Sequence, residues 1–188
     1  MCMRRSLFAL LIAVFVAAAV AAPAGAASTG AAWHSYALYN GKTAVEGGSG
    51  THSSRLTRML LPDRWSPKVN KAKTRISFGP VGTCHSTGAI APALVASTAT
   101  TSAAVLAEQI KGGTTYGSGT NGPASYRVAK FSGGALKAAY VGPTRLAGVW
   151  VVIRATTTPH GTCHIGGVRE SLGFPLADAF ATIHANGY

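Results

Sequence analysis

Acidic residues are scarce in this sequence: five Asp and Glu stand against 17 Lys and Arg, and the formal net charge is +12. Arg4 and Arg5 belong to an N-terminal segment that we expect to be removed. The rest of the chain has fifteen basic and five acidic residues, a net charge of about +10. Such a charge attracts polyanions whatever their sequence. Cell-wall teichoic acid, anionic lipid and nucleic acid are all candidate partners, and charge alone does not choose among them.

Cysteine is also scarce. Cys2 lies in the N-terminal segment, so the mature chain keeps only Cys84 and Cys163. An even pair in an oxidising compartment predicts one disulfide; two free buried thiols are the alternative. Closing so long a loop stabilises a fold by roughly 4 kcal/mol in the chain-entropy model. One bridge does not replace a core, but a hydrophobic content of 47% is enough to build one in a single domain.

Only one long hydrophobic run is present, from Leu7 to Ala22. It follows Arg4 and Arg5 and precedes the small residues 24–26, as in a secretory signal peptide. A membrane anchor is the alternative, but the run is shorter than the roughly 20 apolar residues that a spanning helix needs. We therefore expect cleavage after Ala26 or Ala27, no membrane span in the mature chain, and a secreted, extracellular protein.

Familiar catalytic motifs are missing. No G-x-S-x-G elbow is present, which argues against a Ser-His-acid hydrolase. A Cys-His nucleophile is disfavoured because neighbouring side chains of a strand point to opposite faces, and because a disulfide would consume the thiol.

One motif is written twice. Residues 75–88 (RISFGPVGTCHSTG) and 154–167 (RATTTPHGTCHIGG) share Arg, Pro, Gly-Thr-Cys-His and a closing Gly at one constant offset. GSGT also occurs twice, at 48–51 and 117–120, and each half ends in an apolar segment of helical spacing. These features predict an internal duplication; coincidence in a Gly- and Thr-rich chain is the alternative. The predicted organisation is a signal peptide (1–26), an N-terminal strand region (27–47), half-repeat 1 (48–113) and half-repeat 2 (114–188), with 27–188 forming one folded domain.

Strands are predicted where β-branched or aromatic residues lie between turn formers, at 33–40, 74–79, 126–131, 136–141 and 147–156. The last three form a predicted meander, and helices are expected at 102–113 and 176–187. Segment 54–65 fits either a helix or a strand. The fold class that follows is a single α+β domain, an antiparallel sheet with two helices packed on one face. Its internal pseudo-twofold repeat would be stapled by the Cys84–Cys163 disulfide.

The repeated motif has a structural interpretation and a chemical one. In the first, Pro ends a strand, Gly turns the chain and Cys staples the two halves. In the second, His85, His160 and His164 bind zinc or copper, the one cofactor the sequence suggests. No Asp or Glu lies next to these histidines in sequence to accept a hydrogen bond from a metal-bound imidazole.

Positive charge is most concentrated in segment 55–75, where Pro62 and Pro67 favour an exposed loop. It is either a solvated linker or a polyanion-binding surface whose cations hold phosphate or carboxylate while Trp65 stacks on a ring. The residues of this predicted surface are Arg55, Arg58, Arg64, Trp65, Lys68, Lys71, Lys73 and Arg75.

The function that follows is a secreted basic, non-enzymatic binding module for an anionic cell-envelope polymer or a protein partner. The alternatives are an extracellular hydrolase and the histidine metal-binding protein. A ribonuclease is the hydrolase that fits best, because two histidines and a cation suffice to cleave RNA and the chain has both in excess.

Overall fold

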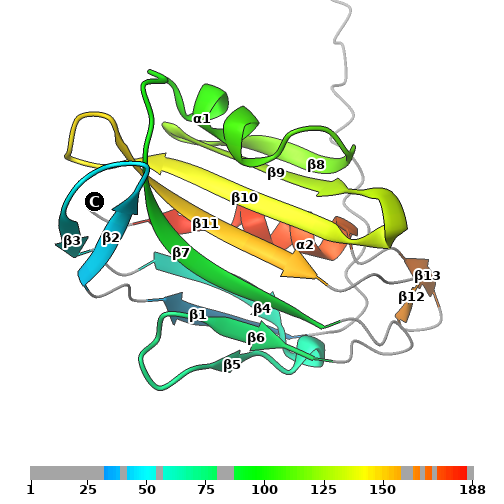
Figure 1. The fold of residues 1–188 in the computed structure, drawn as a ribbon. Helices are drawn as coiled ribbons and strands as arrows, with labels where there is room; N and C mark the ends of the chain where they lie inside the picture. Colours follow the sequence, from blue (N-terminus) through cyan, green and yellow to red (C-terminus); the bar gives the residue numbers. More distant parts are fainter. Residues whose placement is uncertain are drawn as a thin grey trace, which may run out of the picture.

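The structure is a computed structural model that describes residues 32–38, 42–53, 57–79, 87–157, 163–165, 168–170 and 173–185. Strands dominate it, and two helices complete it (Figure 1). This confirms the α+β class expected from the sequence.

A large, mostly antiparallel sheet forms the centre of the molecule. Its main path runs β3 (Thr51–Ser53), β2 (Lys42–Glu46), β7 (Gly88–Ala96), β11 (Val149–Thr157), β10 (Leu136–Pro143), β9 (Ala124–Lys130) and β8 (Thr114–Asn121). β6 (Ile76–Phe78) also pairs with β7, and β5 (Lys68–Val69) pairs with β6. The pair β2–β7 is parallel, a departure from the expected antiparallel sheet. The predicted meander is confirmed as β9, β10 and β11.

Two small sheets accompany the large one. The first contains β1 (Trp33–Leu38), β4 (Thr57–Pro62) and β14 (His184–Ala185); the second is the pair β12 (Cys163–Ile165) and β13 (Val168–Glu170). β4 resolves the ambiguity of segment 54–65 in favour of a strand. Its residues alternate, with Thr57, Met59 and Leu61 buried and the positions between them exposed, as in a strand packed on one face.

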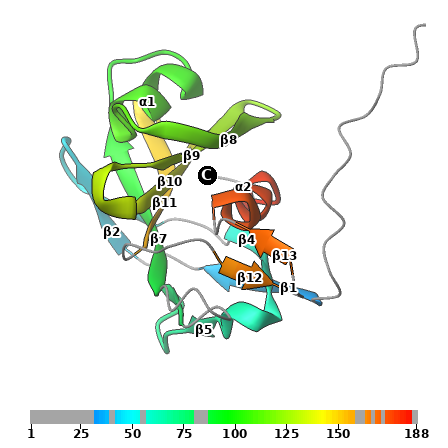
Figure 2. The same cartoon turned by 90° about the vertical axis from the view of Figure 1, so that its right-hand side faces the viewer.

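The main core lies between the large sheet and the first small sheet. We call the side of the large sheet that faces this core its inner face. Ile90, Val128, Tyr140 and Ile153 lie on this face. Helix α2 (Gly173–Ala181) fills the space between β8, β9 and β10 on one side and β4 on the other (Figure 2). Phe180 and Leu176 of α2 are fully buried there.

The opposite, outer face of the large sheet carries helix α1 (Ser102–Gln109). Val105 and Leu106 pack on a second apolar cluster that includes Ala139 and Val152. The side chain of Thr101 caps the helix by accepting a hydrogen bond from the Ala104 amide at 3.2 Å. α1 packs on β9 and β10, and Lys137 and Thr156 of the outer face are exposed.

The expectation that both helices pack on one face is therefore wrong: α1 and α2 cover opposite faces. The two helical segments share an apolar spacing, but they differ in how much of their surface is buried. In α2, four of the five positions from Leu176 to Phe180 are buried, whereas α1 buries a narrow stripe. A helix buried on two sides belongs between two layers, and a one-sided helix belongs on an outer surface.

Strand β7 was not predicted, although it is central to the sheet. Pro92 lies in its middle and has no N–H to donate to a ladder. On the side away from β11, β6 pairs with Gly88–Ile90 and β2 pairs with Leu94 and Val95. Pro92 falls between these two described partners, where the sheet tolerates its missing donor. Strands β2, β3 and β8 were also not predicted.

The predicted duplication stays a prediction, as do its boundaries. Among the described residues, the long strand β7 follows the GTCH motif of the first half, whereas in the second half β12 begins within the motif, at Cys163, and pairs with β13. Cys84 lies outside the described residues, and Cys163 is described only through its backbone in β12. No helix in the described part of the chain has the length and apolar character needed to cross a bilayer.

Candidate functional site

The most basic part of the sequence folds as a strand, a 3-10 turn and a hairpin. The expected exposed loop at 55–75 is wrong, because β4, η1 (Asp63–Trp65), β5 and β6 occupy the described part of that segment. Asn70 shapes the hairpin turn. Its side-chain Oδ1 accepts hydrogen bonds from the amides of Thr74 at 2.8 Å and Arg75 at 3.0 Å, and its Nδ2 donates to Thr74 Oγ1 at 3.0 Å. The turn is thus held by one side chain rather than left as an open linker.

Four cations extend from this hairpin: Lys68, Lys71, Lys73 and Arg75 are all exposed. None forms an ion pair with a described carboxylate. Glu46 instead pairs with Arg154 at 2.7 Å. Lys73 has a left-handed backbone, with φ of 57°, which the hydrogen bonds of Asn70 maintain. These four residues form one unopposed cluster of positive charge.

Trp65 is not available for the role that the sequence suggested. Its side chain is fully buried, and its ring packs against Phe78 with centroids 5.1 Å apart. A tryptophan enclosed in the core cannot stack on an external ligand. The prediction that Trp65 belongs to the binding surface is therefore wrong. Arg64 in the same turn is half-buried, and its Nε atom is buried.

The predicted surface is also divided in space. Arg58 is exposed on β4, on the side facing away from the Met59 and Leu61 that enter the core. Lys68 and Arg75 instead lie on the outer side of the large sheet, since Lys68 is opposite Ser77, which alternates with the buried Ile76 and Phe78. Arg55 lies outside the described residues. The structure therefore brings together the four hairpin cations and separates Arg58 from them.

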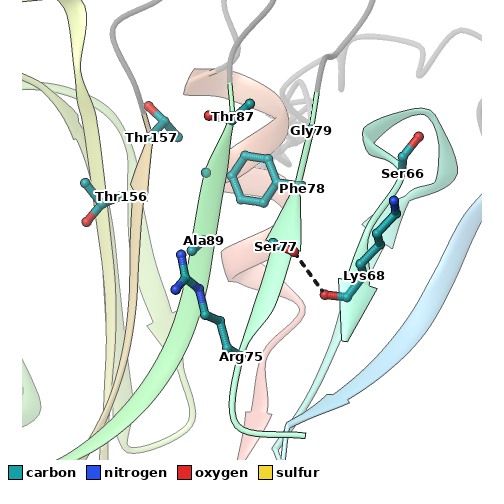
Figure 3. Close-up of a pocket in the computed structure, with 11 residues that line it drawn as sticks. Ser66, Lys68, Arg75, Ser77, Phe78, Gly79, Thr87, Ala89, Thr156 and Thr157 are labelled. Carbon is teal, nitrogen blue, oxygen red and sulfur yellow. Dashed lines mark hydrogen bonds between the residues drawn. The ribbon is translucent and has the colours of Figure 1, made fainter. Parts of the chain in front are cut away.

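A pocket of about 820 Å³ opens beside the hairpin (Figure 3). The Arg75 side chain extends toward Ala89 on β7, and Lys68 extends along β5 toward Ser66, with Ser77 between the two cations. The Ser77 hydroxyl donates to the Lys68 carbonyl at 3.4 Å. The described lining contains no acidic side chain and no histidine; it consists of Ser66, Lys68, Arg75, Ser77, Phe78, Gly79, Thr87, Gly88, Ala89, Thr156 and Thr157.

Sequence reasoning found the two cations of this pocket and missed its hydroxyl groups. Ser77, Ala89 and Thr156 come from three strands, and only the register Ser77–Ala89–Thr156 across β6, β7 and β11 brings them together. Their one signal in the sequence is an alternation of small polar and apolar residues, which does not identify strand neighbours. The arrangement suits an anion, because two cations and several hydroxyl groups line one pocket without a competing carboxylate among the described residues.

The predicted metal site lies largely beyond the description: His85 and His160 are outside it, and His164 is seen only through its backbone in β12. Among the described residues, no three His, Cys, Asp or Glu side chains are grouped as a metal ion would require. The histidine metal site stays a prediction.

His34 and His184 both flank β4, yet they do not converge. His34 is opposite Leu61, whose side chain enters the core, whereas His184 is opposite Arg58, which faces away from it. His34 Nε2 lies 3.0 Å from Asp63 Oδ2 in an exposed ion pair. Two histidines on opposite faces cannot serve as acid and base at one bond.

Tyr36 lies next to this ion pair on the same side of β1. Burial raises the pKa of the Tyr36 phenol above its ordinary value, and the nearby Asp63 carboxylate raises it further. A raised pKa keeps the phenol protonated and neutral at physiological pH. Tyr36 is therefore not a phenolate base beside His34.

Comparison of this chain with protein-family models, with curated proteins and with solved structures gave no match.

Proposed function

We propose that this protein is a secreted, non-enzymatic binding module that holds an anionic polymer of the cell envelope at the β5–β6 hairpin. The observation that carries the proposal is the pocket that Lys68 and Arg75 line from two sides together with hydroxyl groups, while no described lining residue is acidic. Charge-assisted hydrogen bonds from such donors are the usual means of holding phosphate or carboxylate.

Binding is favoured over hydrolysis by the residues that line the pocket. Cleavage of a phosphodiester at neutral pH calls for a positioned general base and acid, most often histidine or a carboxylate. The described lining supplies neither, and His34 and His184 lie on opposite faces of their sheet. An extracellular ribonuclease therefore stands as the competing outcome of the test below.

We also propose that Cys84 and Cys163 form the disulfide of the mature protein. Phe78 is opposite Gly88, and Gly88 is opposite Thr157, so β6, β7 and β11 share one end of the large sheet. Both GTCH motifs adjoin this end in sequence. The disulfide would then tie two segments that meet the sheet beside the pocket.

Affinity for poly(glycerol phosphate), measured by titration calorimetry, tests the proposed binding. We expect the double variant K68A/R75A to bind about tenfold more weakly, because two charge-assisted contacts are lost. Its dependence on salt should also be shallower, since each lost phosphate contact reduces the slope of log affinity against log salt by roughly 0.7 for a flexible strand.

The matched control is R58A/R145A, which removes the same charge from exposed positions away from the pocket. Equal weakening of both variants would show that only net charge matters and would overturn the proposed site. Turnover of a fluorogenic RNA substrate by the purified wild type, lost in K68A/R75A, would replace the binding module with the ribonuclease.

A further inference from the structure

A second basic pocket opens beside strands β8 and β9 of the same sheet. It has a volume of about 750 Å³ and lies where the segment after α1 meets the end of β9. Its described lining has two cations, Lys111 and Lys130, and no acidic side chain; the other lining residues are Gly112, Gly113, Thr114, Tyr116, Phe131 and Ser132. In composition it resembles the hairpin pocket, with cations and hydroxyl groups around a phenylalanine, and it has Tyr116 as a second aromatic residue.

The wall of this second pocket is held in place by Arg127. Its guanidinium donates to the carbonyls of Ile110 at 3.1 Å, Gly112 at 3.0 Å and Gly113 at 3.2 Å. Gly113 has φ of +78°, and an added Cβ there would lie 2.9 Å from the Lys130 carbonyl. Arg127 is thus committed to the fold, while Lys111 and Lys130 remain exposed.

Strand register places both pockets at one end of the large sheet. Starting from Phe78 in the first pocket, successive partners across β7, β11, β10 and β9 are Gly88, Thr157, Leu136 and Lys130. Four strand spacings of about 4.8 Å separate β6 from β9, so the two pockets are about 19 Å apart.

Lys137 lies between the two pockets on the outer face. It is opposite Thr156, which lines the first pocket, and its Nζ lies 4.8 Å from the ring centroid of Phe131, which lines the second. The row that joins the pockets otherwise has only the small side chains of Ser77, Ala89 and Thr156. Lys130 is opposite the buried Leu136, so its side chain leaves the end of β9 toward the inner side. A flexible polyanion that follows this row on the outer face therefore reaches the second pocket first at Lys137 and Phe131, and meets no carboxylate among the described residues of the row.

The ligand that fits is a chain without aromatic bases. Proteins that bind single-stranded nucleic acid stack successive bases on exposed aromatic side chains. Here all the described aromatic side chains are at least half-buried; the two that line the second pocket are Tyr116 and Phe131, and Lys137 Nζ already lies over the Phe131 ring. Hydroxyl groups beside the cations suit a ligand that carries hydroxyls of its own, such as a polyol phosphate.

We propose that the Lys111–Lys130 pocket is a second anion subsite, and that one polyol-phosphate chain spans both pockets by way of Lys137. The inference rests on the proposed function, because it extends the same ligand from the hairpin pocket to a second point of attachment. A chain held at two points gains affinity through its high effective concentration at the second one.

The test compares the affinities of two poly(glycerol phosphate) chains. A chain of two units is too short to span about 19 Å, and a chain of about twelve units is long enough. The longer chain has about six times as many phosphates, which alone would make it bind roughly sixfold more tightly. For the wild type we expect the ratio of the two affinities to be at least about tenfold larger than that. In K111A/K130A the ratio should fall to about sixfold while the two-unit ligand binds as before. K137A should give an intermediate ratio.

The control R58A/R145A removes the same charge and should keep the wild-type ratio. If K111A/K130A matches this control while K68A/R75A loses binding, the second subsite is overturned and the proposed function survives. If K68A/R75A also binds like the wild type, the proposed function fails as well. Tighter binding of an oligoribonucleotide of equal charge than of the twelve-unit polyol phosphate would overturn the choice of ligand.

Discussion

Gly88 is the residue on which the geometry of the hairpin pocket depends. A Cβ at this position would lie 2.2 Å from Cζ of Phe78, far inside van der Waals contact. Phe78 cannot easily yield, because it is 2% exposed and packs on Trp65. Glycine is needed here for space rather than for an unusual backbone conformation, since its φ is not positive.

We therefore expect Gly88→Ala to lower the free energy of unfolding by about 1 to 3 kcal/mol, as overpacking of a core commonly does. Chemical denaturation followed by tryptophan fluorescence measures it. Gly79→Ala is the control, because an added Cβ there meets no described atom within 4 Å and should change stability by less than about 0.5 kcal/mol. Similar losses in both variants would contradict the packing explanation.

For single residues, the sequence correctly predicted which cations are exposed, but it did not predict that Trp65 is buried. Lys68, Lys71, Lys73 and Arg75 are exposed as expected, because an unpaired cation seldom enters a core. Trp65 was predicted to be exposed because its neighbours in sequence are charged. A 3-10 turn of three residues is too short to show a periodic apolar pattern, so the sequence does not reveal that this side chain is buried. Its burial follows from contact with Phe78, thirteen positions further along the chain.

At the scale of elements, the β5–β6 hairpin owes its shape to Asn70. Removing this side chain leaves the charge unchanged and breaks the hydrogen bonds to Thr74 and Arg75. We expect Asn70→Ala to weaken binding of poly(glycerol phosphate) about two- to fivefold, because the cations lose their common orientation. The free energy of unfolding should fall by about 1 kcal/mol.

Thr74→Val supplies the comparison, since it removes the hydroxyl contact alone and keeps the two backbone hydrogen bonds to Asn70. It should bind nearly as the wild type does. Calorimetric titration of both variants with poly(glycerol phosphate) measures these affinities. Unchanged affinity in Asn70→Ala would mean that the hairpin cations act as a diffuse charge, without a required arrangement.

The elements that were predicted are those with local signals. β9, β10 and β11 have continuous or alternating apolar residues between glycine-rich turns, and both helices have apolar residues at helical spacing. β7 lacked such a signal because Pro92 interrupts it, and β8 because glycines and threonines replace apolar residues. In β8, Gly117 allows close packing, since a Cβ there would lie 2.5 Å from Ala177 of α2. Such a requirement is set by the partner helix and is not visible in the strand itself.

For the molecule as a whole, the pattern of strand and helix segments predicted the class of fold, and composition predicted an excess of positive charge. Neither predicted the layers, because the order of β6, β7 and β11 in the sheet arises from contacts between distant segments. The same contacts assemble the hairpin pocket from residues 66–79, 87–89 and 156–157. Local sequence patterns cannot predict a pocket whose residues are brought together by the register of three strands. They can predict that the cations in it are exposed.

The proposed disulfide belongs to this largest scale, because it would connect the two ends of the central part of the chain. Mass spectrometry of the secreted protein under non-reducing conditions should show one Cys84–Cys163 bridge and no free thiol. Reduction should lower the melting temperature substantially, since roughly 4 kcal/mol is a large share of the 5 to 15 kcal/mol that typically stabilises a domain. The variant C84S/C163S is the control: its melting temperature should match that of the reduced wild type and should not respond to reductant. Two free thiols in the secreted wild type would contradict the bridge, and with it the interpretation of the repeated GTCH as a pair of stapled segments at one end of the sheet.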